Sequence, residues 1–112
     1  MSEKQKLLIV DDSELNRDIL KEILGSRYDY MEAENGTQAI QILEVHPEID
    51  LMLLDINMPQ MNGFQVLEHM RELQWIDEVP VVMISSEESV EIMRKAYDLG
   101  ITDYISRPFD AV

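Results

Sequence analysis

Acidic, hydroxyl and cationic side chains come just after the short apolar runs of this 112-residue chain. Asp11 and Asp12 follow the first run, and Asp55 follows the third. Ser85 follows the fourth run, and Arg107 lies close behind the fifth. Two unit charges about 4 Å apart repel by about 4 kcal/mol at an effective dielectric constant near 20. Acids that share one pocket therefore retain protons or bind a divalent cation.

The ligand atoms of this set are of the kind that magnesium prefers. Carboxylate oxygens, in a chain without cysteine, favour Mg²⁺, with Mn²⁺ as the alternative, over zinc or copper. A carboxylate can also attack phosphorus and form an acyl phosphate. Asp55 is the acid best placed to attack, and Asp11 and Asp12 are suited to holding the metal. Ser85 and Arg107 would contact the phosphoryl oxygens.

Each of these residues also has a purely structural interpretation. Residues 11–13, Asp-Asp-Ser, would serve as an N-terminal cap for the first helix. Asp55 would be a polar end of a strand, Ser85 another helix cap, and Arg107 a surface charge. The coincidence of all these positions at the ends of apolar runs favours the functional interpretation.

The runs and the stretches between them predict alternating strands and helices. Strands are predicted over residues 7–10, 28–33, 49–54, 81–84 and 101–105, and apolar residues recur at helical spacing within 15–24, 39–43, 64–73 and 90–97. Strands that are apolar on both faces and separated by helices indicate a doubly wound parallel sheet. In such sheets ligands bind beyond the carboxyl ends of the strands, where the residues above would meet.

The composition argues against proteins that bind nucleic acid or membranes. Nine basic and 23 acidic residues give a formal net charge of -14, so we expect no direct binding to nucleic acid or membranes. The apolar runs are too short to cross a bilayer, and the first residues do not resemble a secretion signal. The absence of cysteine agrees with a cytoplasmic location. The length predicts one domain over residues 1–112.

Four segments together resemble the receiver domain of two-component response regulators, along essentially the whole chain. They are Leu8–Asp12, Leu53–Pro59 with Met61–Gly63, Pro80–Ser85, and Asp103–Phe109. The resemblance implies an α/β, flavodoxin-like sheet of five parallel strands in the order 2-1-3-4-5. It also implies a signalling switch in which Asp55 takes a phosphoryl group from the phosphohistidine of a sensor histidine kinase or phosphotransfer protein. Such a switch catalyses only its own phosphorylation and dephosphorylation.

The resemblance assigns the metal ligands and the residue that binds the phosphoryl group. Asp12, Asp55 and the backbone carbonyl of Asn57 would bind Mg²⁺, which Asp11 would reach directly or through water. Ser85 would bind the phosphoryl group and pull on its own loop. Because Ser85 keeps the hydroxyl that the family carries here as Ser or Thr, we expect this function to be retained.

Other positions are assigned by the resemblance to switching and to the lifetime of the phosphoryl group. Tyr104 would turn inward and remodel the surface of the fourth helix and fifth strand. Asn57 and Glu87 would adjust how water reaches the acyl phosphate, and a polar pair there indicates fast hydrolysis. Arg107 stands where the family usually has lysine. Because arginine presents a planar fork instead of a compact ammonium, we expect phosphorylation with an altered lifetime or coupling.

The family's fifth helix is missing or truncated in this sequence. Receiver domains end with a helix that shares one sheet face with the first helix, whereas this chain stops at Val112. We therefore expect residues 1–112 to be the N-terminal part of a longer protein, with a linked or separate output domain. An apolar sheet face left uncovered would promote self-association.

Two other functions fit part of the pattern. An aspartyl-phosphate phosphohydrolase also uses a strand-end aspartate and Mg²⁺, but that class has an Asp-x-Asp pattern with the second acid as general acid. Asn57 holds that second position here. The other alternative is a receiver-like binding module that is never phosphorylated. Turnover of small phosphate esters would identify the phosphohydrolase. Reaction with acetyl phosphate or a beryllofluoride salt in the presence of Mg²⁺ would distinguish a receiver from the module that is never phosphorylated.

Overall fold

Five parallel strands form one sheet in the order β2-β1-β3-β4-β5, as predicted. The computed structural model describes residues 4–58, 61–86 and 89–106. The strands are β1 (Gln5–Val10), β2 (Tyr28–Ala33), β3 (Leu51–Asp55), β4 (Val81–Ser85) and β5 (Asp103–Ser106). The helices are α1 (Glu14–Leu24), the 3₁₀ helix η1 (Gly25–Arg27), α2 (Gly36–Val45), α3 (Gly63–Glu72) and α4 (Val90–Asp98). The doubly wound, flavodoxin-like arrangement is thus confirmed.

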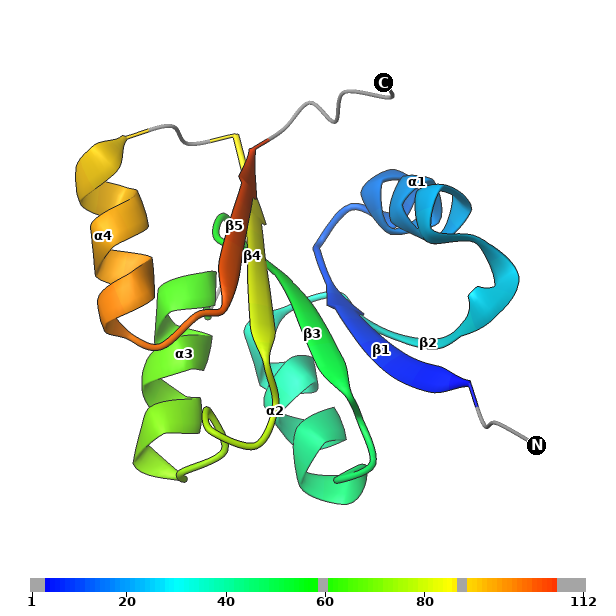
Figure 1. Cartoon of the computed structure of the whole chain (residues 1–112), viewed down its shortest axis with the longest axis horizontal. Helices are drawn as coiled ribbons and strands as arrows, with labels where there is room; N and C mark the ends of the chain where they lie inside the picture. Colours follow the sequence, from blue (N-terminus) through cyan, green and yellow to red (C-terminus); the bar gives the residue numbers. More distant parts are fainter. Residues whose placement is uncertain (1–3, 59–60, 87–88, 107–112) are drawn as a thin grey trace.

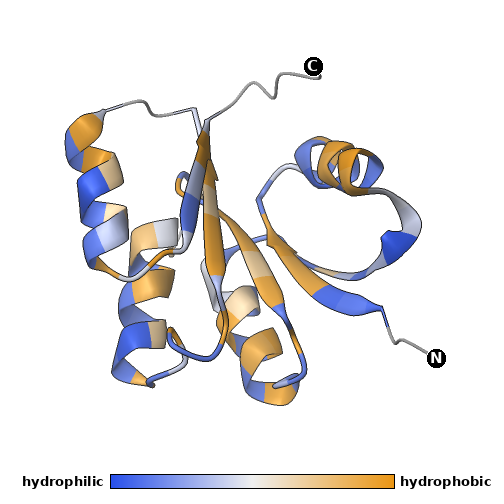
Figure 2. Cartoon of the chain, in the orientation of Figure 1, coloured by the Kyte–Doolittle hydropathy of each residue, from blue (hydrophilic) through white to orange (hydrophobic). Residues whose placement is uncertain are grey.

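Helices cover both faces of the sheet, but unequally. In the described part of the chain, α2, α3 and α4 lie on one face and α1 lies on the other (Figure 1). Since side chains alternate along a strand, Leu8 and Val10 belong to the large core, which includes residues of α2, α3 and α4, and Ile9 belongs to a smaller core with Leu20 of α1. This double burial explains why β3 and β4 are hydrophobic along nearly their whole length (Figure 2). Among the described residues, no helix has the length and apolar content needed to span a membrane.

Two helix ends show why the chain turns where it does. Gly25 ends α1 with a φ of 81°, which glycine adopts readily, and its N–H donates to the carbonyl of Lys21. Asn62 caps α3 reciprocally with Gln65, because each side chain accepts a hydrogen bond from the other residue's backbone N–H. Helix α3 consequently begins at Gly63, one residue before the stretch that the sequence predicted to be helical.

Three strands begin at positions that differ from the predicted ones. β1 begins at Gln5, two residues early, because its polar first residues pair with β2 as regularly as the apolar ones do. β3 and β5 each begin two residues late. The N–H of Ile49 donates to the carbonyl of His46, and the N–H of Ile101 donates to Ala96 at the end of α4. Both residues therefore complete turns after helices before the strands start.

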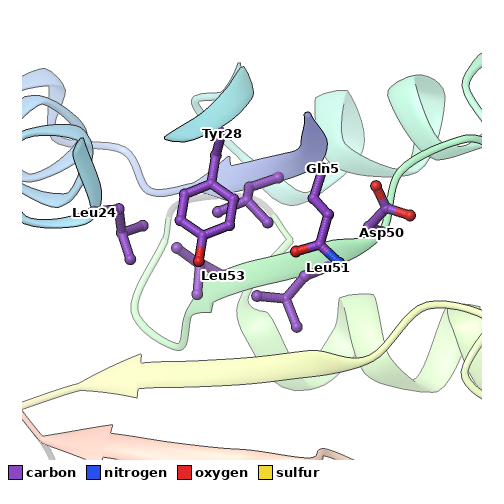
Figure 3. A pocket seen from close by; sticks show the side chains of 7 residues that line it. Gln5, Leu24, Tyr28, Asp50, Leu51 and Leu53 are labelled. Carbon is purple, nitrogen blue, oxygen red and sulfur yellow. The ribbon is translucent and has the colours of Figure 1, made fainter. Parts of the chain in front are cut away.

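The sheet face under α1 keeps an open groove. Ile9, Leu53 and Ile84 on this face are buried, whereas Ile105 of β5 is 40% exposed. A cavity of about 190 Å³ lies beside the end of α1 and is lined by Gln5, Leu7, Leu24, Tyr28, Asp50, Leu51 and Leu53 (Figure 3). The prediction that the fifth helix is missing or truncated concerns the end of the chain, which lies outside the described residues. Self-association through this face stays a prediction.

We expect the mass measured by sedimentation equilibrium to rise with protein concentration, because apolar side chains on this face remain accessible. Ile105→Lys should lower the association, since it places a charge on the same face. Leu73→Lys is the control, because Leu73 is 47% exposed and follows α3 on the other side of the sheet. A monomer mass that is independent of concentration would argue against this prediction.

Leu8 and Leu15 form a matched pair for testing the core. Leu8 is fully buried, whereas Leu15 is 68% exposed. Leu8→Ala should lower the free energy of unfolding by about 2–5 kcal/mol, because it removes buried methyl groups and leaves a cavity. Leu15→Ala should change it by less than about 0.5 kcal/mol. Urea unfolding measures both, and equal losses would contradict the described core.

Candidate functional site

Three carboxylates meet at the carboxyl ends of β1 and β3. Asp11, Asp12 and Asp55 each contribute one oxygen, and these oxygens all lie within 4.8 Å of one another. Asp11 and Asp55 are only 2% and 4% exposed, whereas Asp12 is exposed. The acidic cluster of these three residues is therefore largely buried and meets solvent at Asp12. The structure brings together the acids that the sequence grouped.

The turn between β1 and α1 is held by strand pairing and by a helix cap. The Asp11 N–H donates to the carbonyl of Ala33 in β2 at 3.1 Å. Asp11 Oδ1 accepts from the N–H of Ser13 at 2.9 Å, and the Ser13 hydroxyl accepts from the N–H of Asn16 at 3.2 Å. Ser13 is the N-cap of α1. The capping interpretation therefore applies to Ser13 and not to Asp12.

Asp55 and Ser85 end neighbouring strands at the same edge of the sheet. Asp55 pairs in register with Ile84, the residue before Ser85. Ser85 is fully buried and pairs with Ser106 of β5. The N-cap of α4 is Ser89, so Ser85 is not a helix cap. The parallel sheet thus places a buried carboxylate and a buried hydroxyl residue on adjacent strand ends.

Two glycines allow α2 and α3 to approach the loop that follows β3. A Cβ atom on Gly63 would clash with the carbonyl oxygen of Asp55 and would lie 2.9 Å from the Cα of Ile56. A Cβ atom on Gly36 would lie 2.6 Å from the carbonyl oxygen of Met61. The N–H of Gly63 also donates to the carbonyl of Ile56 at 2.9 Å. The backbone of Asp55 and Ile56 is therefore packed closely against Gly63, and the backbone of Met61 is packed against Gly36.

A buried arginine beside the acidic cluster was missed by the sequence analysis. Arg17 is 7% exposed and donates from Nη1 to the Asp11 carbonyl at 2.6 Å and from Nε to Glu32 Oε1 at 2.9 Å. Lys21 Nζ donates to the other Glu32 oxygen at 2.9 Å. Lys21 first, and then Arg17, lower the pKa of the Glu32 carboxyl. The available signal was a charged residue three positions before Leu20, on the core side of α1.

The other predicted residues are placed as follows. Asn57 is exposed, two residues after Asp55. Tyr104 is 9% exposed and belongs to the large core, and its N–H donates to Asp103 Oδ1 at 2.8 Å. Glu87 and Arg107 lie outside the described residues.

The donor set of the acidic cluster fits a hard divalent cation. Three carboxylates within 4.8 Å supply oxygen ligands only, and the cluster contains no histidine or cysteine. Magnesium commonly uses one or two carboxylates and keeps several water ligands, so a largely buried cluster with one exposed acid suits it. Soft or nitrogen-preferring metals are not favoured by these ligands.

The fold and the acidic cluster define a class of phosphorylation-linked signalling domains, and a family match identifies the class. A family model described as the response regulator receiver domain matches residues 7–112. The chain belongs to this family, the receiver domains of two-component response regulators. Members of the family are signalling switches and not enzymes in the ordinary sense, in agreement with the function predicted from the sequence.

Individual relatives agree with the family match. The chemotaxis protein CheY1 of Helicobacter pylori is 36% identical over 106 residues, which cover 93% of this chain and 86% of that protein. A probable cyclic di-GMP phosphodiesterase of Vibrio cholerae is 34% identical over 102 residues, which cover 91% of this chain and 23% of that protein. A chain in the crystal structure of the CheX–CheY–BeF3–Mg²⁺ complex from Borrelia burgdorferi matches with a TM-score of 0.87 and 30% identity, covering 95% of this chain and 80% of that chain.

Gly63→Ala should disturb the site directly, because the added methyl group meets the backbone of Asp55 and Ile56. We expect a loss of about 1–3 kcal/mol in the free energy of unfolding and shifted amide resonances for residues 55–57. Gly25→Ala is the control, since a Cβ there meets no atom within 4 Å and only its positive φ is strained. Unchanged resonances at 55–57 in Gly63→Ala would show that the close packing is wrong.

Proposed function

We propose that Asp55 accepts a phosphoryl group from the phosphohistidine of a sensor histidine kinase or a phosphotransfer protein, in the presence of Mg²⁺. The observation that supports this most strongly is the approach of the Asp11, Asp12 and Asp55 oxygens to within 4.8 Å of one another. Asp55 ends the central strand of the sheet, so it lies where parallel sheets bind their ligands. A nucleophilic carboxylate beside a cation site is the arrangement that phosphoryl transfer uses.

In the transfer, a carboxylate oxygen of Asp55 bonds to phosphorus while the bond from phosphorus to the imidazole nitrogen breaks. The nitrogen keeps the electron pair, and the product is an acyl phosphate on Asp55. Water later attacks the phosphorus, which releases inorganic phosphate and restores the carboxylate. Asp11, Asp12, Asp55 and the backbone carbonyl of Asn57 would hold Mg²⁺, which when bound offsets the negative charge on the phosphoryl oxygens. The domain catalyses only these two reactions of its own side chain.

The phosphoryl group is proposed to act on the rest of the domain through Ser85 and Tyr104. Ser85 is buried at the end of β4, and its hydroxyl would donate to a phosphoryl oxygen and draw its loop inward. Tyr104 lies on the adjacent strand β5, in the large core, and would pass this movement to the surface formed by α4 and β5. Arg107 would contact a further phosphoryl oxygen. Asn57 and Glu87 would set how easily water reaches the acyl phosphate.

The cellular setting is proposed from the relatives and from the charge. The structure of the Borrelia burgdorferi complex contains Mg²⁺ and BeF3, which supports Mg²⁺ as the cation here. The Vibrio cholerae phosphodiesterase matches over only 23% of its length, which supports residues 1–112 as the receiver of a longer regulator with a linked or separate output domain. The net charge of -14 favours basic partner surfaces over nucleic acid or membranes. The proposed location is the cytoplasm.

Phosphotransfer tests the proposal directly. The wild-type chain should gain one phosphoryl group from acetyl phosphate or a phosphorylated histidine kinase when Mg²⁺ is present, and should gain none in EDTA. Asp55→Asn should not be phosphorylated, because the amide oxygen is not a comparable nucleophile. Intact-protein mass spectrometry measures the adduct. Rapid turnover of small phosphate esters would favour the phosphohydrolase instead, and no adduct on the wild type would favour a module that is never phosphorylated.

Arg107→Lys is expected to keep phosphorylation and to change the lifetime of the acyl phosphate or its coupling to output, because a compact ammonium replaces a planar fork. Release of inorganic phosphate after removal of the phosphodonor measures the lifetime. If the lifetime and the coupling both match those of the parent, Arg107 does not have the proposed role.

A further inference from the structure

We propose that Arg17 is a positioning residue for the acidic cluster, acting through the peptide that joins Asp11 to Asp12. Nothing in the family resemblance or in the sequence pattern assigned Arg17 to the site. The inference rests on the proposed function, because it concerns the acids that would hold Mg²⁺. The contact on which it depends is the hydrogen bond from Arg17 Nη1 to the carbonyl oxygen of Asp11, at 2.6 Å.

This hydrogen bond restrains two of the three acids at once. The Asp11 carbonyl belongs to the peptide plane between Asp11 and Asp12, so fixing that oxygen limits the rotation that would move either carboxylate. On its other side, Asp11 is held through its N–H by the carbonyl of Ala33 at 3.1 Å. The backbone of Asp11 is therefore held from β2 and from α1 together. Asp12, the exposed acid of the cluster, extends from this restrained peptide.

The guanidinium suits this position because it makes two contacts in different directions. Arg17 Nε donates to Glu32 Oε1 at 2.9 Å while Nη1 reaches the turn. Glu32 thus orients the Arg17 side chain. Because the guanidinium is planar and rigid, this contact also fixes the direction in which Nη1 donates to Asp11. A lysine has one compact ammonium and would pair with the carboxylate of Glu32 in preference to a neutral carbonyl. Because Glu32 is exposed, its ion pair with Arg17 adds little net stability, so stabilisation alone does not account for Arg17.

The charge of Arg17 and its hydrogen bond to Asp11 have opposite effects on the affinity of the acidic cluster for Mg²⁺. A positive charge close to the acidic cluster repels Mg²⁺, so removing the charge alone would strengthen Mg²⁺ binding. Loss of the hydrogen bond to Asp11 would loosen the turn and weaken binding. The direction of the change in affinity therefore distinguishes positioning from simple electrostatics.

Lys21 provides a matched control on the same helix. Its Nζ donates to Glu32 Oε2 at 2.9 Å and pairs with Asp18 at 3.3 Å, one turn beyond Arg17. Lys21→Met removes one positive charge that pairs with the same Glu32 carboxylate. It leaves the hydrogen bond from Arg17 to Asp11 in place. Arg17→Lys keeps the charge and the pairing with Glu32, so it should fold even if Arg17→Met does not.

The test compares the parent with Arg17→Met, Arg17→Lys and Lys21→Met by calorimetric titration of MgCl2 into each 112-residue chain. We expect Arg17→Lys to raise the dissociation constant of Mg²⁺ by about tenfold, the size of effect seen when the support of a metal ligand is removed. Arg17→Met should raise it by less, because it also removes a charge that repels the cation. Lys21→Met should stay within about twofold of the parent. In EDTA, amide hydrogen exchange of Asp11 and Ser13 should be faster in the Arg17 variants and unchanged in Lys21→Met.

Each result bears on the inference. Arg17→Lys with parental Mg²⁺ affinity and parental exchange at Asp11 and Ser13 overturns it. Tighter binding in both Arg17→Met and Lys21→Met would show that Arg17 acts only through its charge. If the parent itself binds no Mg²⁺, the proposed function fails, and the exchange rates in EDTA still decide whether Arg17 positions the turn.

Discussion

Repulsion among three carboxylates at one edge of the sheet is the interaction on which the rest of this structure depends. Asp11 and Asp55 are almost fully buried, where a negative charge is less well solvated than at the surface. The oxygens of the cluster nevertheless lie within 4.8 Å of one another. A rigid, apolar sheet must hold them there, and fully buried residues such as Leu8 and Leu54 supply that rigidity from the central strands. The arrangement is unfavourable in isolation, and a shared cation would offset the repulsion.

The cluster is supported by contacts from several elements around it. The turn that carries Asp11 is held by the Ala33 carbonyl, by the Ser13 cap and by Arg17. The loop after Asp55 is confined by Gly63, which leaves no space for a side chain. Each support comes from an element that follows or neighbours a strand end. The same local geometry that forms a doubly wound fold therefore also determines how closely the acids approach one another.

Hydrophobic patterning predicted a parallel sheet, and strand-end positions predicted that the three acids would meet, because parallel topology brings strand ends together. The strand order 2-1-3-4-5 came from the family resemblance. The sequence did not predict the bond from Arg17 to Asp11, because that contact depends on how α1 packs over the turn. Nor did it predict the tight contact at Gly63, since the distance between a helix start and a strand end is set by tertiary packing. The start of β1 at Gln5 was missed because polar residues at the beginning of a strand pair with the next strand as well as apolar ones do.

The most direct test of the shared-cation account is the free energy of unfolding as a function of Mg²⁺ concentration, for the wild type and for Asp12→Asn. The account predicts that Mg²⁺ stabilises the wild type, by about 1.4 kcal/mol at ten times the dissociation constant. Asp12→Asn should be the more stable protein in EDTA, because one repelling charge is gone, and should gain less from Mg²⁺. A wild-type stability that is independent of Mg²⁺, or an Asp12→Asn variant that Mg²⁺ stabilises as strongly as the wild type, would contradict the account.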